Sequence, residues 1–342
     1  GEDLATASRY VRFQNGLSDR FAEAIVRSGL YMDGIEDALR AQDVPSVLSR
    51  LPFVESMFIN LARSKVGASG AWQFMLGTAR LYLPMSSAVD SRVDPVIAAD
   101  GAARMLRHDY DVLGSWPLAI SAYNHGRAGI ARAVKQVGSS DLGVIVERYK
   151  ARRFGFASRN FYCEFIAAAQ VYEERESLFP GIEPAPALEF DEFVAARYVS
   201  LTDLSSLARL ELEELRELNP ALDNDVFAGT LLVPRGYPLR VPPGSKASVS
   251  SAYSSIPESR KRTSQLQTGY RVRSGDTLGV IARRYGTTVG EIQRANRLPR
   301  ADRIYINQYL RIPGQSAVAF GSPLQVSPGR SSIHTVARGE SL

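Results

Sequence analysis

The sequence predicts an α+β protein of several domains: a mainly α-helical domain over residues 1–183, followed by small modules built as strand, helix, helix, strand (βααβ). The helical domain is predicted because apolar residues recur at three- and four-residue spacing through stretches such as 21–39 and 96–113, while strand patterns are nearly absent there. The modules are predicted because one motif in the C-terminal third of the chain occurs twice.

The repeated motif marks where each module begins. Residues 270–278 read YRVRSGDTL and residues 334–342 read HTVARGESL, so Val, Gly, an acidic residue, a hydroxyl residue and Leu keep their register. A repeat of this length cannot fold alone. We therefore interpret residues 332–342 as the start of a further module.

The first copy continues through the pattern of a complete module. Apolar spacing predicts helices over 278–285 and 289–296, with a Gly-Thr-Thr turn between them, and the residues YLRI predict a closing strand over 309–312. A complete module is therefore expected over residues 269–314.

A weaker copy of the same pattern lies upstream, over residues 193–240. Its helices are expected within 204–219, and residues 231–234 are matched with the closing residues 310–313. The Gly-Asp-Thr loop is missing, so we expect a degenerate module that packs against the helical domain and binds no sugar. The stretch 241–268 is rich in Pro, Ser, Gly and Gln and is expected to be a linker.

Composition narrows the classes of function. The formal charge of +5 favours an anionic partner, but the basic residues are scattered, so we expect no nucleic-acid binding. The single cysteine, Cys163, excludes an internal disulfide and the usual thiolate zinc sites. We expect no metal, no cofactor and a monomeric chain. No run of about 18 apolar residues occurs, so no membrane-spanning helix is predicted.

One carboxylate has an unusual neighbourhood. Glu55 lies in the stretch LPFVESMF, among apolar residues and beyond a proline suited to the first turn of a helix. Burial raises the pKa of a carboxyl group, which keeps its proton on at neutral pH and makes it a general acid for a leaving sugar oxygen. Alone, this stretch favours a half-exposed surface glutamate over a catalytic acid.

Two further segments give Glu55 its context. Residues 67–75 read GASGAWQFM, and residues 122–126 read AYNHG at the end of another predicted helix. Together with the Glu-Ser pair at 55–56, they resemble the catalytic domain of the lytic transglycosylases. The resemblance covers roughly residues 30–180 and is closest to the membrane-bound lytic murein transglycosylase D family, and more distant to the lysozyme-like goose-type enzymes. The C-terminal modules resemble LysM, a small glycan-binding domain.

The resemblance implies a reaction and a set of site residues. Glu55 would be the sole catalytic acid. It would protonate the glycosidic oxygen between N-acetylmuramic acid and N-acetylglucosamine in peptidoglycan, and then accept the proton of the muramic acid 6-hydroxyl as a 1,6-anhydro ring closes. The implied substrate-binding residues are Ser56, Gln73, Met75, Tyr123, Asn124, Asn160 and Tyr162. The implied glycan-binding residues of the LysM module are Gly275, Asp276, Thr277, Leu278, Ile304 and Asn307.

Two alternatives stay open at this point. A muramidase would use the same acid and let water attack the sugar; such hydrolysis by inversion needs a second carboxylate, for which Asp90 and Asp94 are the nearby candidates. A cell-wall-binding protein without catalysis is the second alternative, and the intact set around Glu55 argues against it.

The partner and location follow from the same resemblance. We expect the chain to bind peptidoglycan glycan strands and to work in the periplasm or as a secreted, cell-wall-associated enzyme. No cysteine that could carry a lipid lies near Gly1, so the sequence does not support anchoring to a membrane.

Overall fold

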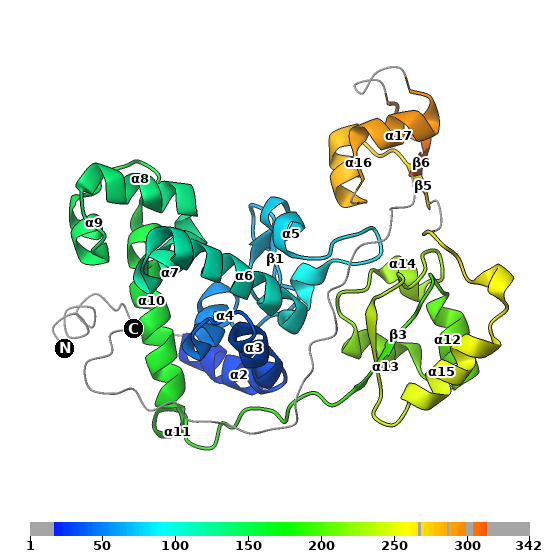
Figure 1. Cartoon of the computed structure of the whole chain (residues 1–342), viewed down its shortest axis with the longest axis horizontal. Helices are drawn as coiled ribbons and strands as arrows, with labels where there is room; N and C mark the ends of the chain where they lie inside the picture. The colour runs from blue at the N-terminus through cyan, green and yellow to red at the C-terminus, as the bar shows by residue number, and fades with distance from the viewer. Residues whose placement is uncertain (1–16, 266–267, 286, 299–303, 313–342) are drawn as a thin grey trace. The chain divides into compact units, whose positions relative to one another are not determined.

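The computed structural model describes residues 17–312, apart from 266–267, 286 and 299–303 (Figure 1). The described residues divide into two compact units: one contains residues up to 74 together with 95–187, and the other contains residues 75–94 together with 188–312. The segment 75–94, expected within the N-terminal domain, thus belongs to the second unit. No helix of the described residues has the length and hydropathy needed to cross a membrane.

The first unit is helical, as predicted. Its central helices pack in a connected series: α6 contacts α3 and α7, and α10 contacts α7, α4 and the 3-10 helix η1 (Figure 1). The elements are α2 (Leu17–Gly29), α3 (Met32–Arg40), η1 (Ser46–Arg50), α4 (Leu51–Glu55), α6 (Pro95–Leu113), α7 (Trp116–His125), α8 (Arg127–Val137), α9 (Leu142–Arg148), α10 (Phe156–Glu173) and α11 (Arg175–Leu178).

Helix α7 has clear signals at both ends. The hydroxyl of Ser115 accepts a hydrogen bond from the Leu118 amide and caps the first turn. Gly126 ends the helix at a φ of 86°, a conformation that a residue with a Cβ rarely adopts. The Ala-Tyr-Asn segment is therefore held on the last turn of a buried helix.

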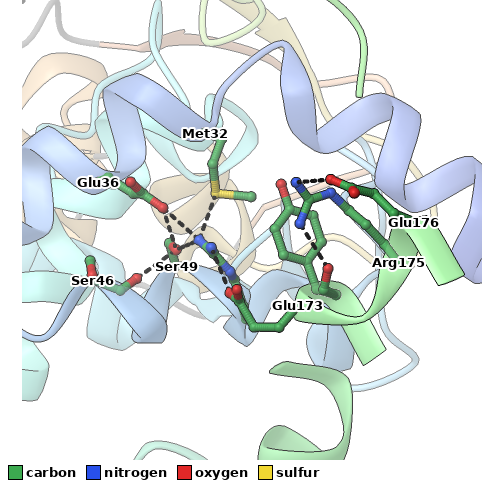
Figure 2. Close-up of polar contacts among 9 residues, drawn as sticks. Met32, Glu36, Ser46, Ser49, Glu173, Arg175 and Glu176 are labelled. Carbon is green, nitrogen blue, oxygen red and sulfur yellow. Dashed lines mark hydrogen bonds and ion pairs between the residues drawn. The ribbon is translucent and has the colours of Figure 1, made fainter. Parts of the chain in front are cut away.

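The start of α4 is anchored by Arg50, whose side chain is 12% exposed. Its guanidinium pairs with Glu36 of α3 at 2.6 Å and with Glu173 of α10 at 3.2 Å, and it lies 4.5 Å from the ring centroid of Tyr172. Figure 2 shows Glu36, Ser49 and Glu173 gathered at this point. Two elements distant in the sequence, α3 and α10, thus fix the short helix that ends at Glu55.

The second unit contains the expected degenerate module, with different boundaries. Strand β3 pairs antiparallel with β4, and Phe193 lies opposite Leu239. Residues 231–234 do not form the closing strand; the correct match to the closing LRIP of the intact module is the LRVP that begins at Leu239. The elements are β3 (Asp191–Val194), α12 (Leu201–Ala208), α13 (Leu212–Leu218), α14 (Asn224–Phe227) and β4 (Pro238–Val241).

The expected linker over 241–268 is largely folded. It contains α15 (Lys246–Ser255), which packs against α12 and β3, and η3 (Glu258–Arg260). Val249, Ala252 and Ile256 are buried, so an apolar stripe at helical spacing lies within the Ser-rich sequence. The prediction was wrong because composition was given more weight than this spacing.

The segment 75–94 contains α5 (Leu76–Tyr82) and η2 (Ser91–Val93), and its second half pairs with the degenerate module. The Asp90 amide donates to the Ala221 carbonyl at 2.8 Å, and the Asp223 amide donates to the Ala88 carbonyl at 2.9 Å. The Asp94 carboxylate, 1% exposed, forms a two-pronged ion pair with Arg240, with distances of 2.7 and 3.2 Å.

The predicted intact module is confirmed. Its strands β5 (Thr268–Arg271) and β6 (Tyr309–Ile312) pair antiparallel, and α16 (Leu278–Arg284) and α17 (Val289–Asn296) lie between them in the chain. Thr288 and Glu291 form a capping box at the start of α17. The residues predicted to start a further module, 332–342, lie outside the described residues.

Candidate active site

Glu55 is the last residue of α4, and the chain leaves the helix in a strained conformation. Met57 and Phe58 both adopt left-handed backbone angles, with φ of 53° and 57°. The Arg27 side chain donates two hydrogen bonds, of 3.1 and 3.0 Å, to the Met57 carbonyl, and the Phe58 amide donates to Pro52. Such strain persists where the surroundings enforce it, and it gathers at functional sites.

The Glu55 carboxyl has the electrostatics of a proton donor. Burial raises its pKa to about 7, and the nearby carboxylate of Glu164 adds to the rise. Within the described part of the chain, no side chain or amide hydrogen-bonds or pairs with the Glu55 carboxyl. A substantial fraction therefore stays protonated near neutral pH, and the proton is not committed to another group.

Glu164 was missed by the sequence-based reasoning, which took Asp90 and Asp94 as the nearby carboxylates. It lies on α10, four residues after Asn160 and so on the same helix face, and burial raises its pKa. Projecting the predicted helix would have found it. The candidates Asp90 and Asp94 are both engaged in ion pairs: Arg92 binds Asp90 at 2.8 Å, and Arg240 binds the buried Asp94.

A short hairpin faces α7. Strands β1 (Ala68–Ser69) and β2 (Phe74–Met75) pair, and the turn between them carries Trp72. The Tyr123 hydroxyl donates to the Trp72 carbonyl at 2.8 Å, and the Ser56 hydroxyl donates to Ala71 at 2.9 Å. The fully buried Trp72 indole donates to the Pro95 carbonyl. Ser56 and Tyr123 therefore fix the hairpin backbone.

Tyr123 is close enough to Glu55 for their charges to interact. Burial raises the pKa of the Tyr123 phenol, and the Glu55 carboxylate raises it further. The phenol is thus neutral over the working range of an enzyme. Because the Tyr123 proton is donated to the Trp72 carbonyl, the phenol adds no charge beside Glu55 in either state of the acid.

Gln73 and Met75 are placed differently from each other. Gln73 has a φ of 48°, and its side-chain amide donates to the Gly70 carbonyl at 2.8 Å, which closes the turn. Met75, on β2, is 45% exposed. Gln73 therefore holds the backbone of the turn, whereas the Met75 side chain is exposed at the end of the hairpin.

Asn124 lies on the last turn of α7 and is exposed. Its side-chain oxygen accepts from the Ser158 hydroxyl at 3.1 Å, and Ser158 also contacts Nδ1 of His125 at 3.0 Å. Burial, together with Arg132, lowers the pKa of His125. His125 is therefore neutral at neutral pH and acts as a hydrogen-bonding group in the wall of the site.

The structure does not bring Tyr162 to Glu55. Tyr162 lines an apolar pocket with Trp116 and Ile120, and it lies two residues from Glu164 on α10. Two residues correspond to a turn of about 200° around a helix, so the two side chains point to opposite faces. The Asn160 amide group donates to the Phe156 carbonyl within its own helix.

In the LysM module, most predicted glycan-binding residues have structural roles. The Asp276 carboxylate accepts from the Tyr270 hydroxyl at 2.6 Å and from the Arg273 amide at 2.8 Å, and the Tyr270 bond lowers its pKa. Thr277 caps α16, and Leu278 is buried in the core. Gly275 has a φ of 82°. This loop is therefore needed to build the module, whether or not it touches sugar.

The closing segment of that module has the larger exposed surface. Ile304 packs against the core, and the Asn307 amide donates to the Val272 carbonyl at 2.7 Å. Beside them Tyr305, Ile306 and Tyr309 are 69%, 62% and 63% exposed. Sequence reasoning did not single out these three side chains. Apolar side chains left exposed beside a fixed backbone loop are suited to stacking on sugar rings.

Among the described residues, no group of three or more His, Cys, Asp or Glu side chains is arranged so that it could hold a metal ion.

Comparisons with known proteins agree with both regions. Residues 34–144 match the family model described as the transglycosylase SLT domain, and residues 270–313 match that of the LysM domain. Membrane-bound lytic murein transglycosylase D of Escherichia coli (strain K12) is 25% identical over 357 aligned positions, which cover 98% of this chain and 73% of that protein.

Two further matches are more local. The probable peptidoglycan endopeptidase LytE of Bacillus subtilis (strain 168) is 49% identical over 47 residues, 14% of each chain. The X-ray structure of an inactive mutant of lytic transglycosylase Slt from Pseudomonas aeruginosa matches 44% of this chain at 22% identity and a TM-score of 0.35. This chain covers 24% of that structure.

Proposed function

We propose that this protein cleaves peptidoglycan glycan strands with formation of 1,6-anhydromuramic ends, and that Glu55 is the catalytic acid. The chain carries the SLT domain of the lytic transglycosylase enzyme family together with a LysM domain. The observation that carries the proposal is the state of Glu55: a carboxyl group at the end of a short anchored helix, with its pKa raised to about 7 and no described partner for its proton. The substrate bond is the one between N-acetylmuramic acid and N-acetylglucosamine.

The reaction uses Glu55 twice. The carboxylic acid first gives its proton to the glycosidic oxygen, and the bond between that oxygen and C1 of the muramic acid breaks. The 6-hydroxyl oxygen of the same muramic acid then bonds to C1, and its proton passes to the Glu55 carboxylate. The acid is restored without water. A pKa near the working pH suits a group that must both give and take a proton.

The neighbouring residues support these two steps. Tyr123 holds the Trp72 carbonyl and presents a neutral phenol beside the Glu55 charge. Asn124 and Met75 offer an exposed amide and an exposed apolar surface for the sugars. Asn160, on the same face of α10 as Glu164, is a further candidate contact. The LysM domain binds peptidoglycan and would keep the enzyme on the cell wall, which places the chain in the cell envelope.

The direct test is Glu55→Gln, which keeps the size of the side chain and removes the transferable proton. We expect turnover of purified sacculi to fall by at least about a hundredfold, as is typical when a general acid is lost. Glu147→Gln, at an exposed position on α9, is the matched control and should keep wild-type turnover. A folded Glu55→Gln protein within threefold of wild type would exclude Glu55 as the acid and would favour a non-catalytic role.

Hydrolysis is the second candidate function, and the position of Glu164 favours testing it. A carboxylate that influences Glu55 could activate a water molecule instead of leaving the attack to the 6-hydroxyl. Digestion in oxygen-18 water separates the two outcomes. We expect anhydro-ended products without the heavy label; label in new reducing ends would show hydrolysis.

The variant Glu164→Gln sharpens this test through pH. Ionised Glu55 cannot donate, so activity should fall as pH rises through about 7. Because the Glu164 charge raises the pKa of Glu55, its removal should lower that pKa and move the alkaline limb of kcat to lower pH. If Glu164 were instead the base for water, Glu164→Gln would abolish turnover at every pH.

A further inference from the structure

A second pocket of the first unit lies at the C-terminal end of α7 and has a volume of about 580 Å³. Three arginines line it: Arg132 of α8, and Arg152 and Arg153 of the loop between α9 and α10. The lining includes no aspartate and no glutamate. The pocket is thus a concentration of positive charge in a chain whose basic residues are otherwise scattered.

The three guanidinium groups are available to a ligand. Neighbouring arginines are used within the fold: Arg127 pairs with Asp109 at 2.8 Å, and Arg159 donates to the carbonyls of Tyr149 and Phe154. By contrast, Arg132, Arg152 and Arg153 are exposed and form no ion pair with any residue that the structure describes. Several unpaired cations around one cavity favour an anion there.

The frame of the pocket is rigid. Tyr149 and Phe154 delimit the loop that carries Arg152 and Arg153, and both rings are buried in the core formed by α7, α8 and α9. Their centroids lie 5.3 Å apart, edge to face. The His125 ring contacts Phe154 and fits closely against Gly129, where an added Cβ would meet the imidazole at 2.5 Å. The arginines therefore project from a fixed wall.

The pocket adjoins the candidate active site through Asn124. Asn124 lines the pocket and directly follows Tyr123, whose pKa is raised in part by the nearby Glu55 carboxylate. Ser158, also in the lining, links the Asn124 side chain to His125. A ligand group held by the arginines would thus lie beside the residue proposed to contact the sugar.

We propose that this arginine pocket binds a carboxylate of the peptide stem carried by the glycan strand, so that the enzyme prefers strands that bear peptides. This inference rests on the proposed function, because it takes the strand at Glu55 to be peptidoglycan. Guanidinium groups match carboxylates in geometry and charge, and Arg152 and Arg153 can form paired hydrogen bonds to one or two of them.

The test compares two substrates with one variant. The triple variant Arg132→Gln/Arg152→Gln/Arg153→Gln keeps hydrogen-bonding capacity and removes the charges. Its kcat/KM is measured on peptide-bearing strands and on strands freed of peptide by an amidase. We expect a loss of about tenfold or more on the first substrate, as for several lost charge-assisted contacts, and less than twofold on the second.

The matched control removes three positive charges elsewhere in the first unit, as Arg20→Gln/Lys135→Gln/Arg148→Gln. All three are exposed positions outside the pocket lining, and both substrates should be cleaved as by wild type. Unchanged thermal unfolding of both triple variants shows that the fold is kept. An equal loss on the two substrates, or no loss on either, overturns the proposal.

The remaining outcomes are also decisive. Peptide-free strands expose the lactyl carboxylate of muramic acid, so a loss confined to them would reassign the pocket to that group and overturn the peptide stem as ligand. If the wild-type enzyme cleaves neither substrate, the proposed function itself fails. If wild type and the triple variant cleave both substrates equally, the function stands and the pocket proposal falls.

Discussion

Two βααβ modules in this chain share one construction and present different surfaces. In the intact module the Asn296 side chain accepts from the Arg311 amide and donates to the Arg311 and Ile292 carbonyls. In the degenerate module Asn219 makes the same three bonds, to Arg240 and Leu215. The hydrogen bonds that join the second helix to the closing strand are thus kept where the sequences have diverged.

The difference lies in what the equivalent arginines do. The Arg311 side chain is exposed and forms no ion pair with the described residues, whereas Arg240 is 5% exposed and pairs with Asp94. The Gly-Asp-Thr loop of the intact module is replaced by a simple helix cap from Ser200. A module of this fold can therefore serve as a ligand-binding surface or as a structural part, depending on which of its faces stays exposed.

The largest expected effect separates the two arginines. Arg240→Ala leaves the Asp94 carboxylate buried without its partner, which costs about 3–5 kcal/mol. Arg311→Ala removes an exposed side chain and should change the free energy of unfolding by less than about 0.5 kcal/mol. Chemical denaturation of the full chain, followed by circular dichroism, measures both. Similar values for the two variants would contradict the distinction between a buried, paired arginine and an exposed one.

A second expected effect concerns binding. Deleting residues 268–342 should weaken binding to sacculi by about tenfold or more, since a tethered second contact is lost. Turnover of short soluble glycan oligomers should stay within twofold of the full chain, because Glu55, Tyr123 and Asn124 all belong to the first unit. Parallel losses in sacculus binding and oligomer turnover would show that the intact module takes part in catalysis.

The smallest expected effect tests what the modules share. Asn219→Ala and Asn296→Ala each remove three hydrogen bonds and leave backbone groups of the closing strand unpaired, at a cost of about 1–3 kcal/mol. The Asn219 variant should lose more, because Asn219 is fully buried and Asn296 is partly exposed. Thermal unfolding of the two variants gives the order. A neutral effect at either position would mean that the clamp is not needed there.

The sequence alone was sufficient to predict the elements that are determined by their own local residues. Helical spacing located the N-terminal helices, and the two-strand, two-helix order of the intact module was readable from its turns and apolar positions. The burial expected for Glu55 from its apolar neighbours is the main cause of its raised pKa.

The misses have different physical origins. The pairing of Asp94 with Arg240 joins residues 146 positions apart, and no local pattern marks a buried ion pair of that separation. Tyr162 was expected at the site and Glu164 was not considered, yet the Glu164 carboxylate is the one that influences Glu55, because the two side chains point to opposite faces of α10. In the Ser-rich stretch that forms α15, the composition predicted a linker, but three buried apolar residues pack it as a folded helix.

The Asp94–Arg240 pair also sets where this protein can be divided. A fragment that ended near residue 187 would contain Glu55, the hairpin and α7, yet it would expose the edge at Ala88 and Asp90 and leave Asp94 without its cation. The fragment would keep Pro95, whose carbonyl accepts the hydrogen bond of the Trp72 indole. The residues just before Pro95, however, would have lost the contacts that hold them in place. The smallest piece with a complete interior therefore runs through Gln265, whose side chain makes paired bonds to Leu232. In a domain-exchange experiment, residues 188–265 should therefore be kept with the catalytic sequence, and the module to be exchanged begins at residue 268.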